Sequence, residues 1–255
     1  MYKDIETETS YKYLKIVISE LKEPICILGG WAVFFTANKN YQKQALRVYI
    51  GSKDIDIGFN SASSFKRATS ILENRLKFKF VSFRYYTNIH AETGKDLSDE
   101  EVKSMPQHMY FQIYVDPIMS HANSKLESVL GFMPIDEPLL KPVFEDKKYA
   151  NFAKEFSRKL LLPAPEILLA TKICSVILRD KEHKRYKDIC DITALCLFAG
   201  MSIDDIIKSG KSFVSRDKLK KFSNMDFADD IKNCSNTLGL EFGIVKSVID
   251  KVKEK

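Results

Sequence analysis

The sequence has little of what marks membrane, secreted or zinc-binding proteins. No run reaches the roughly 18 uncharged residues of a membrane-spanning helix, and the polar N-terminus lacks the apolar core of a signal peptide. The five cysteines are an odd number without a CxxC pair, so the sequence predicts neither a disulfide framework nor a zinc knuckle. His90, His108 and His183 also lack metal-ligand spacing to another histidine or cysteine. We therefore expect a cytoplasmic protein with reduced cysteines, no zinc site and no membrane partner.

What is present is an ordinary globular composition with an uneven distribution of charge. The 255 residues are 45% apolar and 29% charged, and they suffice for one large domain or two modest ones. The net charge is +6. Residues 1–150 carry 20 Lys and Arg against 19 Asp and Glu, whereas residues 151–255 carry 20 against 15. The C-terminal excess fits either a solvated lysine-rich surface or a polyanionic substrate.

Apolar spacing and turn residues predict a mixed α/β segment up to about residue 160. Helical spacing covers 9–22, 31–38 and 64–76, while buried or alternating strands are expected at 25–28, 53–59, 77–86, 109–119, 129–135 and 158–163. The strand at 109–119 is expected to end at Asp116 and Pro117, because proline cannot donate to a ladder. Residues 38–51 and 87–108 are expected to form long loops.

From Pro165 onward the apolar period is helical. Helices are expected at 165–180, at 184–200 and at 202–210 with Ser202 as the N-cap, followed by two or three more. The prediction is an α+β protein with a small mixed sheet flanked by helices, followed by a helical C-terminal part. We expect a catalytic domain at 1–160 and, at 161–255, a helical domain that completes the site and the substrate cleft.

The segment "GSKDIDIGF", residues 51–59, places two carboxylates on one strand. Side chains alternate along a strand, so Asp54 and Asp56 share a face with their Cα atoms roughly 6.6 Å apart, while Ile55 and Ile57 face the core. Two carboxylates so placed repel each other unless a cation or solvent compensates them, and Mg²⁺ prefers such oxygen ligands. The alternative is a solvated edge strand whose aspartates have no function. The Gly29-Gly30 turn upstream favours the metal site, because backbone N–H groups there can hold a phosphate.

Together these motifs resemble the first motif of the nucleotidyltransferase superfamily with a DNA polymerase β-like catalytic core. The chain is most similar in pattern to the AbiEii/AbiGii toxin-like nucleotidyltransferases. The matching positions are Gly29, Gly30, Trp31, Ala32, Arg47, Ser52, Asp54 and Asp56, and in the C-terminal half Lys172, Lys187, Asp188 and Asp191. The resemblance spans about residues 25–195. The spacing from Gly30 to Asp54 is longer than in compact members of the family, which implies an extended loop at 38–51.

The resemblance implies roles for several of these residues and for Asp116, the carboxylate near the end of the strand at 109–119. Asp54 and Asp56 would bind one or two Mg²⁺ ions, and Asp116 would be a third metal ligand or the general base. Gly29, Gly30, Ser52, Arg47 and Lys172 would contact the nucleotide, and Asp188 would position Lys172.

Alternatives without a catalytic role stay open for three of these residues. The alternative for Asp116 is a turn residue that ends a strand, and the alternative for Lys172 is a lysine whose ammonium reaches the surface along an apolar helix. Asp188 shares a helix face with Asp191, where both would also serve as solvated charges.

The expected function is Mg²⁺-dependent transfer of a nucleotide from a nucleoside triphosphate to an acceptor. The resemblance favours a toxin-like enzyme acting on RNA, such as a tRNA 3′ end, with an antitoxin protein as a partner. A protein hydroxyl or a small molecule is the alternative acceptor. The alternative from another class is a non-catalytic nucleotide- or RNA-binding member of a toxin–antitoxin pair.

Overall fold

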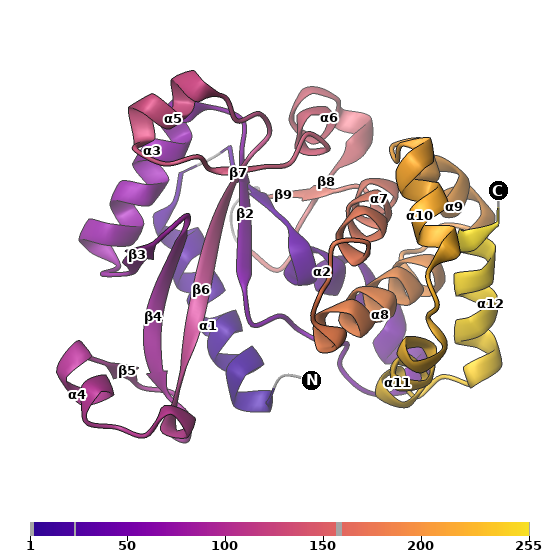
Figure 1. Cartoon of the computed structure of the whole chain (residues 1–255), viewed down its shortest axis with the longest axis horizontal. Helices are drawn as coiled ribbons and strands as arrows, with labels where there is room; N and C mark the ends of the chain where they lie inside the picture. The colour runs from indigo at the N-terminus through magenta and orange to yellow at the C-terminus, as the bar shows by residue number, and fades with distance from the viewer. Residues whose placement is uncertain (1–2, 23, 157–159, 255) are drawn as a thin grey trace. The chain divides into compact units, whose positions relative to one another are not determined.

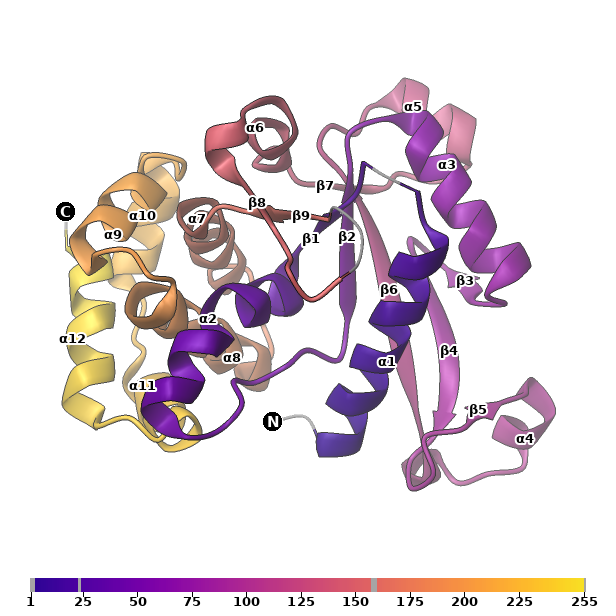
Figure 2. The same cartoon turned by 180° about the vertical axis from the view of Figure 1, so that it is seen from behind.

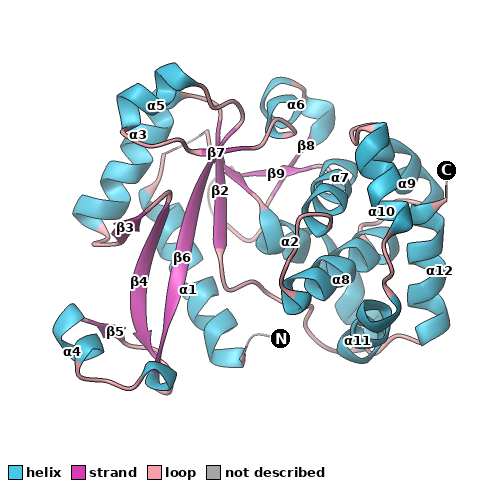
Figure 3. Cartoon of the chain, in the orientation of Figure 1, coloured by secondary structure: helices cyan, strands magenta, loops and turns pink. Residues whose placement is uncertain are grey.

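The computed structural model describes residues 3–22, 24–156 and 160–254, and the chain divides into two compact units. The sheet unit comprises residues 2–31 and 51–162, and the helical unit comprises residues 32–50 and 163–255. The two units differ in secondary structure, as the colours of Figure 3 show: the first contains the strands and the second is built of helices. The fold is therefore the expected one, a mixed sheet flanked by helices with a helical C-terminal part.

Nine strands of the described chain form one mixed sheet, in the order β3-β4-β6-β2-β1-β9-β8, with β5 paired to β4 and β7 paired to β6 (Figure 1). The strands are β1 (Cys26–Ile27), β2 (Ile55–Phe59), β3 (Lys79–Val81), β4 (Arg84–His90), β5 (Asp96–Leu97), β6 (Tyr110–Met119), β7 (Ile135–Asp136), β8 (Ala150–Phe152) and β9 (Leu161–Pro163).

Strand β2, which follows Asp54 and contains Asp56, lies inside this sheet. It pairs with β6 in parallel and with β1 antiparallel. Ile55 and Ile57 are only 0% and 1% exposed, as expected for residues on the core-facing side of an alternating strand. The aspartates are thus not on a solvated edge strand.

Helices α1 (Asp4–Glu20), α3 (Ala62–Ser70), α4 (Asp99–Lys103), α5 (Ser124–Leu130) and α6 (Leu140–Glu145) complete the sheet unit. Helix α1 runs beside β6 on one face of the sheet (Figure 2). The indole N–H of Trp31 donates to the Ser10 hydroxyl of α1 at 3.1 Å, so this aromatic residue packs the first helix. Helix α3 begins where the Ser61 hydroxyl accepts from the Ser64 backbone N–H, and it continues into a π-helical turn, Ile71–Arg75.

The helical unit combines most of α2 (Gly29–Ala45) with the C-terminal helices. These are α7 (Pro165–Val176), α8 (Glu182–Phe198), α9 (Ile203–Lys211), α10 (Arg216–Asn224), α11 (Ala228–Leu238) and α12 (Phe242–Lys253). Pro165 occupies the first turn of α7 and Ser202 caps α9, as expected. The Tyr41 hydroxyl donates to the Leu238 carbonyl at 2.9 Å, which ties α2 to the end of α11. None of the described helices is both long and apolar enough to cross a membrane.

The expected loop at 87–108 is wrong, because most of this polar segment is regular. Strand β4 continues to His90 on its pairing with β6, and Asn88 pairs with Leu97 of β5. Ser98 and Glu101 then form a reciprocal capping box that starts α4, and a 3₁₀ turn at Gln107–Met109 leads into β6. Long-range pairing to a buried neighbour stabilises strands whose own sequence is too polar to predict them.

Other boundaries also differ from expectation. The segment 77–86 is a hairpin of β3 and the start of β4 rather than one strand, and it turns at Ser82, where φ is +60°. The expected strand at 129–135 is largely wrong, since Asn123 and Gly131 cap helix α5 and leave only β7. Helix α2 extends to Ala45 and shortens the expected loop at 38–51. The strand expected at 158–163 is β9; residues 158 and 159 lie outside the described chain.

Strand β6 does not end at Asp116 but runs through Pro117 to Met119. Pairing with β4 stops at Val115 and pairing with β7 starts at Ile118, while β2 pairs along the opposite side. Pro117 therefore lies between two partners on one side of β6, where a missing N–H donor is tolerated. Asp116 is consequently a residue inside a strand and not a turn residue.

Candidate functional site

The pairing of β2 with β6 brings two of the three candidate metal ligands together. In this parallel register Asp56 is the partner of Asp116. Paired residues of neighbouring strands project from the same face of a sheet, so Asp116 lies beside Asp56 although it is 60 residues further along the chain. Asp54 lies in the bend that leads into β2, so the expectation that both aspartates stand on one strand is wrong for Asp54.

A cation that the sequence reasoning missed lies among these carboxylates. The Nε and Nη2 atoms of Arg84 donate to Oδ1 and Oδ2 of Asp116 at 2.6 and 2.8 Å, in the two-pronged geometry typical of arginine and carboxylate. Nη2 also lies 3.3 Å from Oδ1 of Asp54. Arg84 begins β4, and continuing the β4–β6 register by one residue places it opposite Asp116.

Electrostatics keep the Arg84 guanidinium charged in this position. Partial burial would lower its pKa, but the hydrogen bonds and charge of Asp116, together with the charges of Asp54 and Asp56, raise the pKa above its ordinary value. The guanidinium also stacks over the Tyr114 ring at 4.0 Å from the centroid. In the sequence, Arg84 is one cation in the alternating stretch "KFKFVSFRYY", so only the pairing of the strands reveals its partners.

Gly29 lies directly against Asp56. Its φ is +59°, and a Cβ added there would lie 1.9 Å from Oδ2 of Asp56. The Leu28 N–H donates to the Asp56 carbonyl at 3.0 Å, which holds the end of β1 beside β2. Gly29 is thus required both by a backbone conformation that L-residues rarely adopt and by the approach of the carboxylate. Gly30 follows it in the first turn of α2.

Gly51 and Ser52 lie in a tightly packed approach to β2. A Cβ on Gly51 would lie 2.9 Å from both Thr7 and the Trp31 ring, and Ser52 is 7% exposed. Packing against α1 and Trp31 therefore requires the small residue at position 51. The structure places Ser52 two residues before Asp54, which leaves its contact with a nucleotide a prediction.

Lys172 and Asp188 lie in the helical unit, where they form a buried ion cluster. The Lys172 ammonium lies 2.9 Å from Oδ1 of Asp188 and 2.7 Å from Oδ2 of Asp191. Its side chain is 9% exposed, so the interpretation of a lysine that reaches the surface is wrong. The side chains of Asp188 and Asp191 are only 2% and 0% exposed, so they are not solvated charges on a helix surface. The expected contact of Asp188 with Lys172 is present, whereas their catalytic roles stay predictions.

Three further residues complete the cluster: Lys187, which matches the family motif, and Arg179 and Tyr49, which the sequence did not indicate. Arg179 donates to Asp188 at 2.7 Å, Lys187 pairs with Asp191 at 2.5 Å, and the Tyr49 hydroxyl donates to Asp191 at 2.7 Å. Burial by itself would lower the pKa of Lys172 and raise that of Asp188. The opposite charges reverse both effects, so the pKa of Lys172 is raised and that of Asp188 is lowered. Both shifts favour the charged forms of Lys172 and Asp188.

Arg47 also belongs to the helical unit. Its Nε donates to the Tyr41 hydroxyl at 2.9 Å, and its guanidinium packs so closely on Gly239 that a Cβ there would lie 2.3 Å from Nη2. The structure thus gives Arg47 a packing role at the end of α11. Its expected contact with a nucleotide stays a prediction.

The carboxylate oxygens of Asp54, Asp56 and Asp116 are the donor type that Mg²⁺ prefers. Because Gly29 has no Cβ, its backbone can lie directly beside Oδ2 of Asp56. Among the described residues, no three His, Cys, Asp or Glu side chains are grouped as a ready metal site. The donor set fits the ion by its chemistry, and the cation seen in contact with two of these carboxylates is Arg84.

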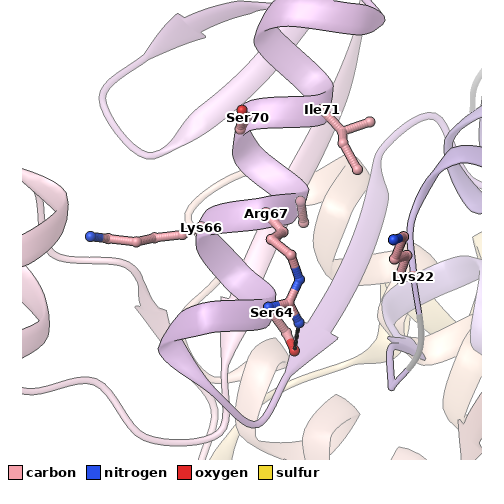
Figure 4. Close-up of a pocket in the computed structure, with 7 residues that line it drawn as sticks. Lys22, Ser64, Lys66, Arg67, Ser70 and Ile71 are labelled. Atoms are coloured by element: carbon pink, nitrogen blue, oxygen red, sulfur yellow. Dashed lines mark hydrogen bonds between the residues drawn. The ribbon is translucent and has the colours of Figure 1, made fainter.

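A cavity of about 380 Å³ in the sheet unit lies along α3 and is separate from these residues. Its lining residues are Lys22, Ser64, Lys66, Arg67, Ala68, Ser70 and Ile71. Figure 4 shows Arg67 directed toward Ser64, to which it donates at 3.3 Å, while Lys66 points away on the other side of the helix. None of the candidate site residues lines this cavity.

Comparisons with known proteins add one structural likeness. No protein-family model matches the chain, and no curated protein matches it. One solved structure is similar, the crystal structure of an antigenic nucleotidyltransferase-like protein from Paracoccidioides brasiliensis. The identity is 14%, the match covers 93% of each chain, and the TM-score is 0.40. A likeness this distant carries no conclusion about function, which has to come from the geometry of this chain.

Proposed function

We propose that this protein is a Mg²⁺-dependent nucleotidyltransferase. The observation that supports the proposal most strongly is the register of β2 and β6, which pairs Asp56 with Asp116 beside Asp54. Two paired carboxylates and a third directly before β2, next to a glycine turn, suit a divalent cation and a polyphosphate together. The motif resemblance described above assigns Asp54 and Asp56 to this chemistry, whereas the assignment of Asp116 rests on its place in the strand.

Asp54, Asp56 and Asp116 would hold one or two Mg²⁺ ions. When bound, Mg²⁺ supplies positive charge that neutralises the phosphate oxygens of a nucleoside triphosphate. Gly29 and Gly30 would let backbone N–H groups approach the triphosphate closely, because neither carries a side chain that intervenes. The Ser52 hydroxyl would add a further donor to a phosphate oxygen.

The reaction is an in-line displacement at the α-phosphorus. A hydroxyl oxygen of the acceptor forms the new bond to phosphorus, and the bond from phosphorus to the oxygen that bridges the α- and β-phosphates breaks. Pyrophosphate leaves, and the proton of the hydroxyl passes to a base, the role we assign to Asp116 if it is not a metal ligand. Lys172 would bind a phosphate and Asp188 would position it, while Arg47 would contact the nucleotide.

We propose RNA, such as a tRNA 3′ end, as the acceptor, and an antitoxin protein as a partner of a toxin-like enzyme. The support for RNA is the basic C-terminal sequence, in which 20 Lys and Arg stand against 15 Asp and Glu over residues 151–255. A protein hydroxyl and a small molecule are the alternative acceptors. The proposal from another class is a non-catalytic nucleotide- or RNA-binding protein.

The test is incorporation of label from each α-³²P nucleoside triphosphate into total cellular RNA, with Mg²⁺, resolved on a denaturing gel. We expect a labelled RNA band with the wild type, and no band with Asp54→Ala/Asp56→Ala or with EDTA, since both treatments remove the metal. Asp99→Asn is the matched control, because this exposed aspartate of α4 pairs with Lys79 on the surface and should leave labelling unchanged.

The same preparations separate the enzyme from the binding protein. A non-catalytic binder would keep its RNA affinity in EDTA and after Asp56→Asn, and would label no acceptor. Folded wild-type protein that labels neither RNA, protein nor small molecules with any nucleotide would contradict the transferase.

A further inference from the structure

We propose that Arg84 is the internal counter-cation of the three carboxylates, and that a divalent metal ion binds there only by displacing its guanidinium. This inference rests on the proposed metal site and adds to it a residue that sets the affinity for the metal. It follows from contacts seen in the structure between one arginine and the carboxylates of two neighbouring strands.

The three carboxylates need a cation that compensates their negative charge. Asp56 and Asp116 are paired neighbours on β2 and β6, and Asp54 lies close enough to contact the same arginine as Asp116, so without compensation their negative charges repel one another. The side chains of Asp54 and Asp116 are only 21% and 10% exposed, which limits how far water can screen that repulsion. Arg84 supplies the charge from the adjacent strand β4.

Arg84 and a metal ion would bind the same carboxylate oxygens. Arg84 takes both oxygens of Asp116 and approaches Oδ1 of Asp54. A Mg²⁺ ion binds carboxylate oxygens at about 2.1 Å, so on the same oxygens it would lie within about 5 Å of a guanidinium nitrogen. Two cations that close in a poorly solvated site repel strongly. The ion and the guanidinium therefore compete for the carboxylates.

The displaced Arg84 side chain has room to move at the edge of the sheet. Arg84 follows a two-residue turn of the β3–β4 hairpin, at the edge of the sheet where β3 has no further described partner. Three apolar residues of the hairpin are partly exposed to solvent: Phe80 is 42% exposed, Val81 44% and Phe83 39%. Phe80 still packs on Tyr85 and Phe132, so the Arg84 guanidinium would leave the carboxylates by rotation of its own long side chain while the hairpin stays in place. A freed Arg84 would remain beside the carboxylates, where it can bind the phosphates of a nucleotide.

The test compares divalent-ion binding by the wild type and by Arg84→Gln, using Mn²⁺ and the loss of its free-ion EPR signal. Removal of a competing charge-assisted pair should tighten Mn²⁺ binding by about tenfold or more. Arg84→Lys, which keeps the charge but cannot bind both oxygens of Asp116, should fall between the two. It also keeps the proposal falsifiable if Arg84→Gln does not fold.

Lys53→Gln is the matched control for charge alone. Lys53 precedes Asp54 in the chain but pairs with Glu6 at 2.7 Å, so it should change Mn²⁺ affinity by less than about threefold, as a partly screened charge does. An equal gain in Lys53→Gln and Arg84→Gln would overturn displacement in favour of a general effect of charge.

Two further outcomes distinguish the inference from the function on which it rests. If Asp54→Asn/Asp56→Asn abolishes Mn²⁺ binding while Arg84→Gln binds no more tightly than the wild type, the metal site stands and the role of Arg84 is refuted. If no variant binds Mn²⁺ in a manner that depends on Asp54 and Asp56, both are refuted.

Discussion

The contact of Gly29 with Asp56 allows a sharp test of the candidate site. In Gly29→Ala the new Cβ would lie 1.9 Å from Oδ2 of Asp56, whereas real Cβ contacts stay beyond 3.0 Å. The carboxylate or the turn must therefore move by about 1 Å. The positive φ of +59° adds about 1–2 kcal/mol of backbone strain. A shift of 1 Å in a catalytic group lowers rates by about 100-fold, so we expect a loss of nucleotide transfer on that scale.

The matched control is Gly131→Ala at the end of α5. Gly131 has φ +81° with nothing within 4 Å of an added Cβ, so its substitution introduces strain without a clash. We expect Gly131→Ala to lose about 1–2 kcal/mol in urea unfolding and to keep its metal affinity and activity. Gly29→Ala should lose more stability and also weaken Mn²⁺ binding. Equal stability losses together with unchanged Mn²⁺ affinity in Gly29→Ala would refute the close approach of Gly29 to Asp56.

The ion cluster of the helical unit and the cap of α9 give the remaining predictions. Lys172→Met should lower the free energy of unfolding by about 3–5 kcal/mol in urea, because it leaves Asp188 and Asp191 buried with less compensation; a loss below about 1 kcal/mol would contradict their burial as ions. The pKa of Asp188 is lowered in the folded protein, so its stabilisation is complete above about pH 4 and is lost as the pH falls through the folded pKa. Thermal unfolding across pH 2–7 should therefore show a steeper acid limb in the wild type than in Asp188→Asn, and parallel limbs would count against it. Tyr49→Phe, which leaves Asp191 without its hydroxyl donor, should cost about 1–3 kcal/mol in the same urea assay, and a neutral effect would argue against the hydrogen bond. Ser202→Ala removes the N-cap of α9 and should cost about 1 kcal/mol of unfolding free energy; no measurable loss would show that the cap does not stabilise the helix.

Local patterns in the sequence predicted many elements and named Asp54, Asp56 and Asp116 as candidates, but not Arg84. Alternation predicted that Ile55 and Ile57 face the core, and both are buried, although β2 begins only at Ile55. Proline and serine marked the starts of α7 and α9. Such features depend on neighbours within a few residues, so the sequence expresses them directly. The loop expected at 87–108 failed because its strands depend on pairing with β6 rather than on their own composition.

Neighbouring residues along the chain account for the periodicities, the caps and the closeness of Asp54 to Asp56 in sequence. The parallel passage of β6 beside β2, which brings Asp116 opposite Asp56, and the place of Arg84 among the carboxylates follow from the folded chain alone. The burial of Lys172 between two aspartates follows from it as well, whereas periodicity left the surface and the site equally open. The physical reason is that strand register and burial depend on contacts between residues far apart in the chain, which no local pattern encodes.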